Sequence, residues 1–215
     1  MLLARLDDGP EIFFTLQGEG VSAGLPAVFV RAALCNLHCR WCDTDHTWNF
    51  EGTPWPHDKD ADPSYRKHRK AEVTIELTAA EIVHAVAAHP CRRVVLTGGE
   101  PLLQQEAWLE VIHGLREIDP AYRFEVETNG TRLPSGEFRE AVDQFNVSPK
   151  LANSGIESRL RTVPAALDFF AAEAKAWFKF VARDAADIAE IEAFAAAHGI
   201  VAEKVLVMPE GRSAE

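Results

Sequence analysis

Residues 27–42 have the sequence AVFVRAALCNLHCRWC, in which an apolar run leads directly into three closely spaced cysteines. The run at 27–33 predicts a strand, because Val and Phe dominate it. Cys35, Cys39 and Cys42 then follow with the spacing C-x3-C-x2-C. In parallel sheets, loops after the carboxyl ends of strands carry the ligand-binding residues. The stretch therefore predicts a strand that ends at a functional loop.

Beyond residue 77 the sequence alternates between helical and strand patterns. We expect helices at 78–89, 103–118, 136–142, 164–174 and 185–197, and strands at 93–97, 122–128, 145–148, 177–182 and 204–208. Alternation of this kind predicts βαβ units and a parallel sheet. With the strand at 27–33 there are six strands, so we expect an α/β fold, a partial (β/α)6 barrel, in one domain spanning residues 1–215. Residues 43–77, which are rich in charge and proline, predict an irregular insertion with a solvated surface.

The charge and the apolar runs of the chain argue against two classes of protein, nucleic-acid binders and membrane proteins. Its 215 residues include 22 Lys and Arg against 33 Asp and Glu, which gives a net charge of −11. A nonspecific nucleic-acid binder needs a basic surface, which this composition does not favour. No apolar run reaches the roughly 18 residues of a membrane span, and the first ten residues lack a signal-peptide pattern. We therefore expect a cytoplasmic protein with no nucleic-acid or membrane partner.

The cysteine loop is the clearest sign of chemistry. Clustered cysteines in a reducing compartment bind metal more often than they form disulfides. Three thiolates can hold three irons of a 4Fe–4S cluster and leave the fourth iron open to another ligand. Two alternatives stay open: a zinc site completed by His38 or His46, and an electron carrier or binding module that uses Cys91 as a fourth ligand. Cys91 stands at the start of an expected strand, where we expect a structural thiol.

Further motifs surround this loop. They are FFTLQGEG at 13–20, TGGEP at 97–101, ETNG at 127–130 and VSPK at 147–150. The cysteine spacing, with an aromatic residue before the last cysteine and Gly-Gly-Glu-Pro after the next strand, resembles the radical S-adenosylmethionine superfamily. FFTLQGEG, Arg31, Cys-Asp-Thr at 42–44 and the later motifs are similar to the 7-carboxy-7-deazaguanine synthase family within it. The resemblance extends over roughly residues 13–211.

This resemblance implies a radical-SAM-type partial barrel and a lyase reaction. The family converts 6-carboxy-5,6,7,8-tetrahydropterin to 7-carboxy-7-deazaguanine with loss of ammonia, a step in the biosynthesis of queuosine and other 7-deazapurines. The implied cofactors are a 4Fe–4S cluster, S-adenosylmethionine and Mg²⁺, with the radical supplied by the cofactor and not by a catalytic side chain. The implied partners are a small-molecule pterin, an external flavodoxin-like or ferredoxin-like electron donor, and a second copy of the chain in a homodimer.

The same resemblance implies roles for individual residues. The cluster ligands are Cys35, Cys39 and Cys42, and Thr44 is the Mg²⁺ ligand, in keeping with the preference of Mg²⁺ for oxygen. The residues implied for S-adenosylmethionine are Trp41, Asp43, Gly99, Glu100, Thr128, Asn129, Ser148, Pro149 and Lys150. Those implied for the substrate are Leu16, Gln17, Gly18, Arg31 and Thr97. The planar guanidinium of Arg31 suits the pterin carboxylate. Lys179 receives no role.

The end of this sequence differs from that of the family. Family members usually continue after MPEG, which occupies 208–211 here, with a helix, a strand and a short tail over the substrate. This sequence ends at Glu215, so we expect either a shortened sequence or a site without that wall.

The alternative function is an activase that installs a glycyl radical on a partner protein, since such enzymes share the cysteine spacing. That function gives no reason for FFTLQGEG and Arg31.

Overall fold

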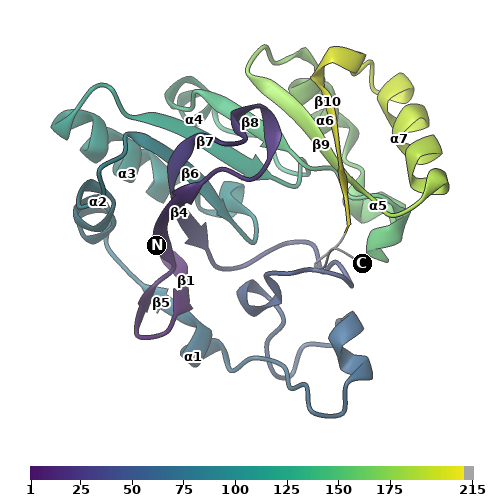
Figure 1. The fold of residues 1–215 in the computed structure, drawn as a ribbon, viewed down its shortest axis with the longest axis horizontal. Coiled ribbons are helices and arrows are strands. Elements are labelled where there is room, and N and C mark those ends of the chain that lie inside the picture. Colours follow the sequence, from purple (N-terminus) through teal and green to yellow (C-terminus); the bar gives the residue numbers. More distant parts are fainter. Residues whose placement is uncertain (211–215) are drawn as a thin grey trace.

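Six parallel strands form the centre of the sheet in the computed structural model, which describes residues 1–210 (Figure 1). They are β4 (Pro26–Ala32), β6 (Arg93–Gly98), β7 (Arg123–Thr128), β8 (Gln144–Val147), β9 (Ala176–Ala182) and β10 (Val205–Pro209). Each pairs in parallel with the next. Within the described residues the path of strands ends at β10 and does not close on itself. The expected α/β fold with a mostly parallel, open sheet is confirmed.

Four more strands join the sheet in antiparallel orientation, and the sequence pattern did not predict them. β1 (Leu2–Leu6) pairs with β2 (Gly9–Pro10), with β4 and with β5 (Thr74–Glu76), while β3 (Ile12–Leu16) pairs with β4. These strands are at most five residues long, too short for a period of two to stand out. The first part of FFTLQGEG therefore belongs to a strand, and only its second part forms a turn.

Helices lie outside the curved sheet (Figure 1). They are α2 (Ala79–Ala87), α3 (Gln105–Ile118), α4 (Gly136–Ala141), α6 (Pro164–Ala172) and α7 (Ala185–Ala197), together with the short α1 (Lys70–Val73) and α5 (Ser158–Arg161). The apolar side of α3 is fully buried through Trp108, Val111, Ile112 and Leu115. Burying one such side chain contributes about 1.5–3 kcal/mol. The longer helices occupy the predicted positions, and in α2 and α3 the apolar period matches the buried face.

The other face of the sheet is more polar. Along β9, Phe178 and Phe180 are fully buried in the core, while Lys179 between them is half-buried. Side chains alternate across a strand, so Lys179 must project from the face opposite the core. Because the helices cover the other face, a binding site can form on this face together with the loops at the carboxyl ends of the strands.

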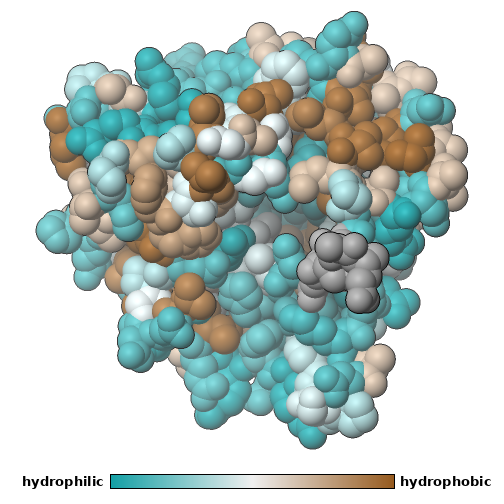
Figure 2. Space-filling view, viewed as in Figure 1, coloured by the Kyte–Doolittle hydropathy of each residue, from teal (hydrophilic) through white to brown (hydrophobic). Residues whose placement is uncertain are grey.

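The insertion at 43–77 is more regular than expected. It contains the 3-10 helices η2 (Asp45–Thr47) and η3 (Asp58–Ala61), then α1, and it ends in β5 within the sheet. Its outer surface is mostly hydrophilic, in the lower part of Figure 2. The expectation that its charges form a solvated surface is wrong for Asp45, which is 1% exposed. Asp45 accepts hydrogen bonds from Lys59 (2.5 Å), Tyr65 (2.5 Å) and His68 (2.9 Å), and this network holds the later part of the insertion against η2 at its start.

Candidate functional site

A cavity of about 420 Å³ opens where the parallel strands end. The predicted site residues that line it are Gln17, Gly18, Arg31, Cys35, Cys39, Trp41, Cys42, Asp43, Thr44, Thr97, Gly99, Thr128, Asn129, Ser148 and Lys150. Leu16, Glu100 and Pro149 are not among the lining residues. Segments from both ends of the described chain thus meet at one cavity, as expected when parallel strands deliver their following loops to one edge.

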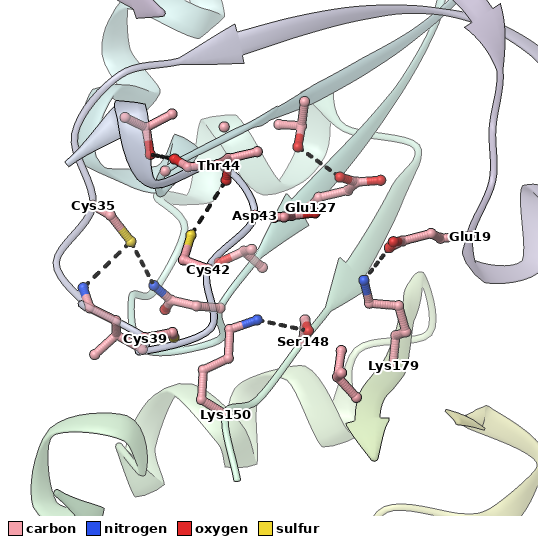
Figure 3. A pocket seen from close by; sticks show the side chains of 18 of the residues that line it. Glu19, Cys35, Cys39, Cys42, Asp43, Thr44, Glu127, Ser148, Lys150 and Lys179 are labelled. Atoms are coloured by element: carbon pink, nitrogen blue, oxygen red, sulfur yellow. Dashed lines mark hydrogen bonds and ion pairs between the residues drawn. The ribbon is translucent and has the colours of Figure 1, made fainter. Parts of the chain in front are cut away.

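The three cysteines of the loop all face this cavity, and none of them is in a disulfide (Figure 3). Burial raises the pKa of Cys39 to about 11. Burial, reinforced by the Glu100 carboxylate, also raises the pKa of Cys35. Both thiols therefore hold their protons at neutral pH until a metal displaces them, and metal binding at this loop must release protons.

Two glycines bring the end of β6 against the start of the cysteine loop. A Cβ on Gly98 would lie 2.2 Å from the Ala32 carbonyl oxygen, and one on Gly99 would lie 2.0 Å from that of Leu34. Gly98 also has a φ of +133°, which side chains rarely tolerate. The Gly99 and Glu100 N–H groups donate to Ala32 and Leu34 at 3.0 and 2.9 Å. The glycine pair therefore lets β6 fix the backbone that leads to Cys35.

Glu100 lies behind the cavity wall. It is fully buried, and its carboxylate accepts hydrogen bonds from Leu102 N–H (3.0 Å), Thr128 Oγ1 (2.8 Å) and Asn129 N–H (2.8 Å). Burial raises the pKa of Glu100 in spite of these bonds. The carboxylate thus connects the TGGEP and ETNG motifs to each other, where the resemblance implied a contact with the cofactor.

Asn129 links the ETNG motif to the cysteine loop. Its Nδ2 donates to Asn36 Oδ1 at 2.9 Å and lies 4.0 Å from the Cys35 sulfur. Asn36 in turn donates to Thr131 at 2.8 Å. These bonds hold the cysteine loop on the carboxyl end of β7.

The turn that follows β3 enters the cavity from the opposite side. Gln17 is 1% exposed and donates to Glu127 at 3.0 Å, and the Thr97 hydroxyl donates to the other Glu127 oxygen at 2.7 Å. Glu19 forms an ion pair with Lys179, on the side of the cavity opposite Cys35 and Cys42 in Figure 3. The turn is therefore attached to β7 and to β9 through charged side chains.

Lys150 lies on the lower side of the cavity in Figure 3. Its Nζ donates to Ser148 Oγ at 3.0 Å and lies 5.7 Å from the centre of the Trp41 ring. A cation over an aromatic face is stabilised by the ring quadrupole. Lys150 therefore connects the loop after β8 to the cysteine loop.

Comparison with known proteins identifies the family. Residues 30–165 match the Radical SAM superfamily. The chain is 39% identical over 210 residues to the 7-carboxy-7-deazaguanine synthase of Pyrobaculum aerophilum, a match that covers 95% of this chain and 80% of that protein. The chain belongs to the 7-carboxy-7-deazaguanine synthase family. It is also 33% identical to the Hyperthermus butylicus synthase, with 93% of this chain and 75% of that one covered.

A solved structure has the same fold. The crystal structure of QueE from Escherichia coli matches with a TM-score of 0.63 and 25% identity, over 93% of this chain and 82% of that chain. These relatives give no support to the glycyl-radical activase alternative. Across residues 1–210, no helix is long and apolar enough to span a bilayer.

Membership of this radical SAM family implies a 4Fe–4S cluster and S-adenosylmethionine, and the cysteine loop fits them. Among residues 1–210, no three His, Cys, Asp or Glu side chains surround a single point as one ion requires. In a cluster, each cysteine binds a different iron, so the thiolates need only face the same cavity. Neither His38 nor His46 lines that cavity, and neither does Cys91. The Cys91 thiol instead donates to the Pro26 carbonyl at 3.3 Å.

Some cavity residues of this synthase family member were not predicted. They are Glu19, Phe29, Leu37, Thr47, Trp48, Gly98, Glu127, Lys179, Val181, Met208, Pro209 and Glu210. Glu127 stands in the ETNG motif, and its position beside Thr128 was the available signal. For Lys179 the available signal was its place between Phe178 and Phe180, because side chains alternate along a strand and Lys179 must lie on the face opposite these two. The MPEG motif continues to Gly211, which lies outside the described residues.

Proposed function

We propose that this chain is a radical SAM lyase that converts 6-carboxy-5,6,7,8-tetrahydropterin to 7-carboxy-7-deazaguanine with release of ammonia, in queuosine and 7-deazapurine biosynthesis. The observation that carries the proposal is the meeting of the cysteine loop and the turn after β3 at one cavity. The 39% identity to a named synthase over 95% of the chain supports it. One side of the cavity offers three thiols, and the other offers carboxylates, amides and cations for a polar heterocycle.

Cys35, Cys39 and Cys42 would hold the 4Fe–4S cluster, since they are the three cysteines that line the cavity. When bound, the cluster and S-adenosylmethionine supply the radical that starts the reaction. Trp41, Asp43, Gly99, Thr128, Asn129, Ser148 and Lys150 would surround the cofactor, and Glu100 and Pro149 would support this wall from behind. The chain's own contribution is to orient both molecules and to exclude competing reactions.

Gln17, Gly18, Arg31 and Thr97 would bind the pterin, with Leu16 setting the path of the turn. Gln17 and Thr97 share Glu127, so three polar groups are held in fixed orientation at this end of the cavity. Fixed donors and acceptors favour one orientation of a flat heterocycle. Arg31 is the cation we assign to the substrate carboxylate, because this residue lines the cavity and its side chain is only 15% exposed.

Thr44 is the proposed Mg²⁺ ligand. Thr44 lines the cavity, and its hydroxyl lies 3.6 Å from the Cys42 sulfur. Mg²⁺ commonly takes one or two protein oxygens and completes its shell with substrate and water. A flavodoxin-like or ferredoxin-like electron donor, a homodimer and a cytoplasmic location stay predictions, and cysteines outside disulfides suit a reducing compartment.

An anaerobic turnover assay tests the function. The reconstituted, dithionite-reduced protein is given S-adenosylmethionine and 6-carboxytetrahydropterin, and 7-carboxy-7-deazaguanine is followed by mass spectrometry. The proposal predicts product with little net consumption of S-adenosylmethionine. Cofactor cleavage without product would contradict the substrate assignment while leaving the superfamily intact.

A further inference from the structure

Glu11 forms a buried contact with Arg31 just outside the cavity. It is the residue before β3, is 8% exposed, and does not line the cavity. The Arg31 Nε donates to Glu11 Oε1 at 2.6 Å, and the Arg31 backbone N–H donates to the Glu11 carbonyl at 3.1 Å. Side chain and backbone thus fix Arg31 to the same neighbour.

The second oxygen of Glu11 is also used. His46 Nε2 lies 2.9 Å from Glu11 Oε2. His46 belongs to η2, which directly follows Thr44. Burial raises the pKa of Glu11, but the hydrogen bonds from His46 and Arg31 outweigh it and leave that pKa below its ordinary value. The carboxylate is therefore charged at neutral pH and joins the strand that carries Arg31 to the loop that carries Thr44.

We infer that Glu11 is a positioning residue that sets the preference of the cavity for a carboxylated pterin, an inference that rests on the proposed function. Within residues 1–210 the hydrogen bond of the Arg31 side chain runs through Nε alone. A carboxylate can bind an arginine side-on, through Nε and one Nη. Because Glu11 already occupies Nε, a second carboxylate cannot bind Arg31 in this way. The two terminal Nη groups remain for an end-on, bidentate pair with the substrate carboxylate.

The same contact lowers the cost of ordering the side chain. An arginine has many rotamers, and fixing it at the moment of binding reduces affinity. Glu11 fixes it beforehand, because its carboxylate is held by His46 and its main-chain carbonyl accepts from the Arg31 N–H of β4. Removal of Glu11 leaves the charge of Arg31 in place and removes its orientation.

Equilibrium binding of two fluorescent probes tests this role without turnover. The probes are 6-carboxypterin and unsubstituted pterin, titrated anaerobically into the reconstituted holoenzyme with S-adenosylmethionine. Wild type is expected to prefer 6-carboxypterin. Glu11→Ala is expected to reduce the affinity for 6-carboxypterin on the order of tenfold, the loss typical of one charge-assisted hydrogen bond, and to leave the affinity for pterin unchanged. Glu11→Gln keeps an acceptor for Arg31 Nε and is expected to restore most of the preference.

Glu173→Ala is the matched control. Glu173 is 3% exposed and is also paired with an arginine, Arg139, but lies outside the cavity. The Glu173→Ala variant is expected to have a lower free energy of unfolding and an unchanged affinity for both 6-carboxypterin and pterin. If Glu11→Ala fails to fold, Glu11→Asp replaces it, since a carboxylate shortened by one methylene cannot contact Arg31 and His46 together. A full preference for 6-carboxypterin in the folded Glu11 variant would overturn the inference.

The two proposals fail in different ways. A wild-type protein that binds both probes equally would overturn the proposed function, and the inference with it. A wild-type preference that is the same in Glu11→Ala would overturn the inference alone.

Discussion

Gln17 Nε2 donates a hydrogen bond to Glu127 Oε1 at 3.0 Å, across 110 residues of sequence. The other oxygen of Glu127 accepts from the Thr97 hydroxyl at 2.7 Å. One carboxylate on β7 therefore orients a residue of the turn after β3 and a residue of β6. Gln17 is 1% exposed, so the amide depends on this partner.

Glu127→Ala is expected to raise the KM for the pterin on the order of tenfold, because Gln17 and Thr97 lose the acceptor that orients both. Glu127→Gln is expected to have a smaller effect, since its amide oxygen still accepts one bond. Steady-state kinetics of the reconstituted enzyme measure the change. An unaltered KM in Glu127→Ala would show that orientation of these groups does not affect substrate binding.

Alanine at Cys35, Cys39 or Cys42 is expected to abolish the 4Fe–4S cluster, since each thiolate binds one iron. Cys91→Ala is the control, because the Cys91 thiol contacts the Pro26 carbonyl and not the cavity. Iron and sulfide content and visible absorbance after anaerobic reconstitution report the outcome. Loss of the cluster in Cys91→Ala would favour the electron-carrier alternative.

Chelation of Mg²⁺ in a buffer containing Na⁺ alone is expected to slow turnover, and Thr44→Val is expected to remove the response to added Mg²⁺. Valine keeps the shape of threonine and lacks the hydroxyl that Mg²⁺ requires. The rate is measured as a function of Mg²⁺ concentration for both proteins. Equal Mg²⁺ responses in the two would exclude Thr44 as the ligand.

Asp45→Ala is expected to lower the free energy of unfolding by about 2–4 kcal/mol, because Lys59, Tyr65 and His68 all lose a buried charged acceptor. Amide hydrogen exchange within 57–70 is expected to accelerate more than exchange in β7. Arg69–Glu72, an exposed ion pair, supplies the control: Glu72→Ala is expected to change stability by less than about 0.5 kcal/mol. Uniform exchange changes along the chain would argue against a role confined to the insertion.

The Glu173–Arg139 pair is expected to make stability depend on pH. Hydrogen bonds and the charges of Arg139 and Lys175 outweigh burial and hold the pKa of Glu173 below its ordinary value of 4.5. A lowered folded-state pKa means that the pair stabilises the fold above about pH 4.5 and that this stabilisation is lost as the pH falls through the folded-state value. The difference in urea unfolding between wild type and Glu173→Gln is therefore expected to shrink below pH 4.5. A difference that stays constant with pH would contradict this.

Local sequence determined most of the parallel sheet and the identity of the cysteine loop. The helices of 79–87 and 105–118 carry an apolar period that matches their buried face, and the six parallel strands lie at the expected positions. The antiparallel strands β1, β2, β3 and β5 were not predicted, because they are too short for a period of two to stand out and because β1 and β5 pair across a long stretch of sequence, with Leu2 opposite Glu76. The burial of Asp45 was also not predicted. The charge-rich composition of residues 43–77 suggested a solvated surface, but Asp45 is buried by three hydrogen-bond partners, of which the most distant is 23 residues away.

The spacing of Cys35, Cys39 and Cys42 predicted a metal-binding loop, and the resemblance of the surrounding motifs to the radical S-adenosylmethionine superfamily indicated that the metal is a 4Fe–4S cluster. The motifs likewise predicted which strand ends face the cavity, since parallel strands send their carboxyl ends to one edge. Only the tertiary structure decided that Glu127 holds Gln17, that Glu100 lies behind the wall, and that Glu11 orients Arg31. Hydrogen bonds between side chains extend only about 3 Å, so which groups are paired depends on how the strands pack and not on their order along the chain.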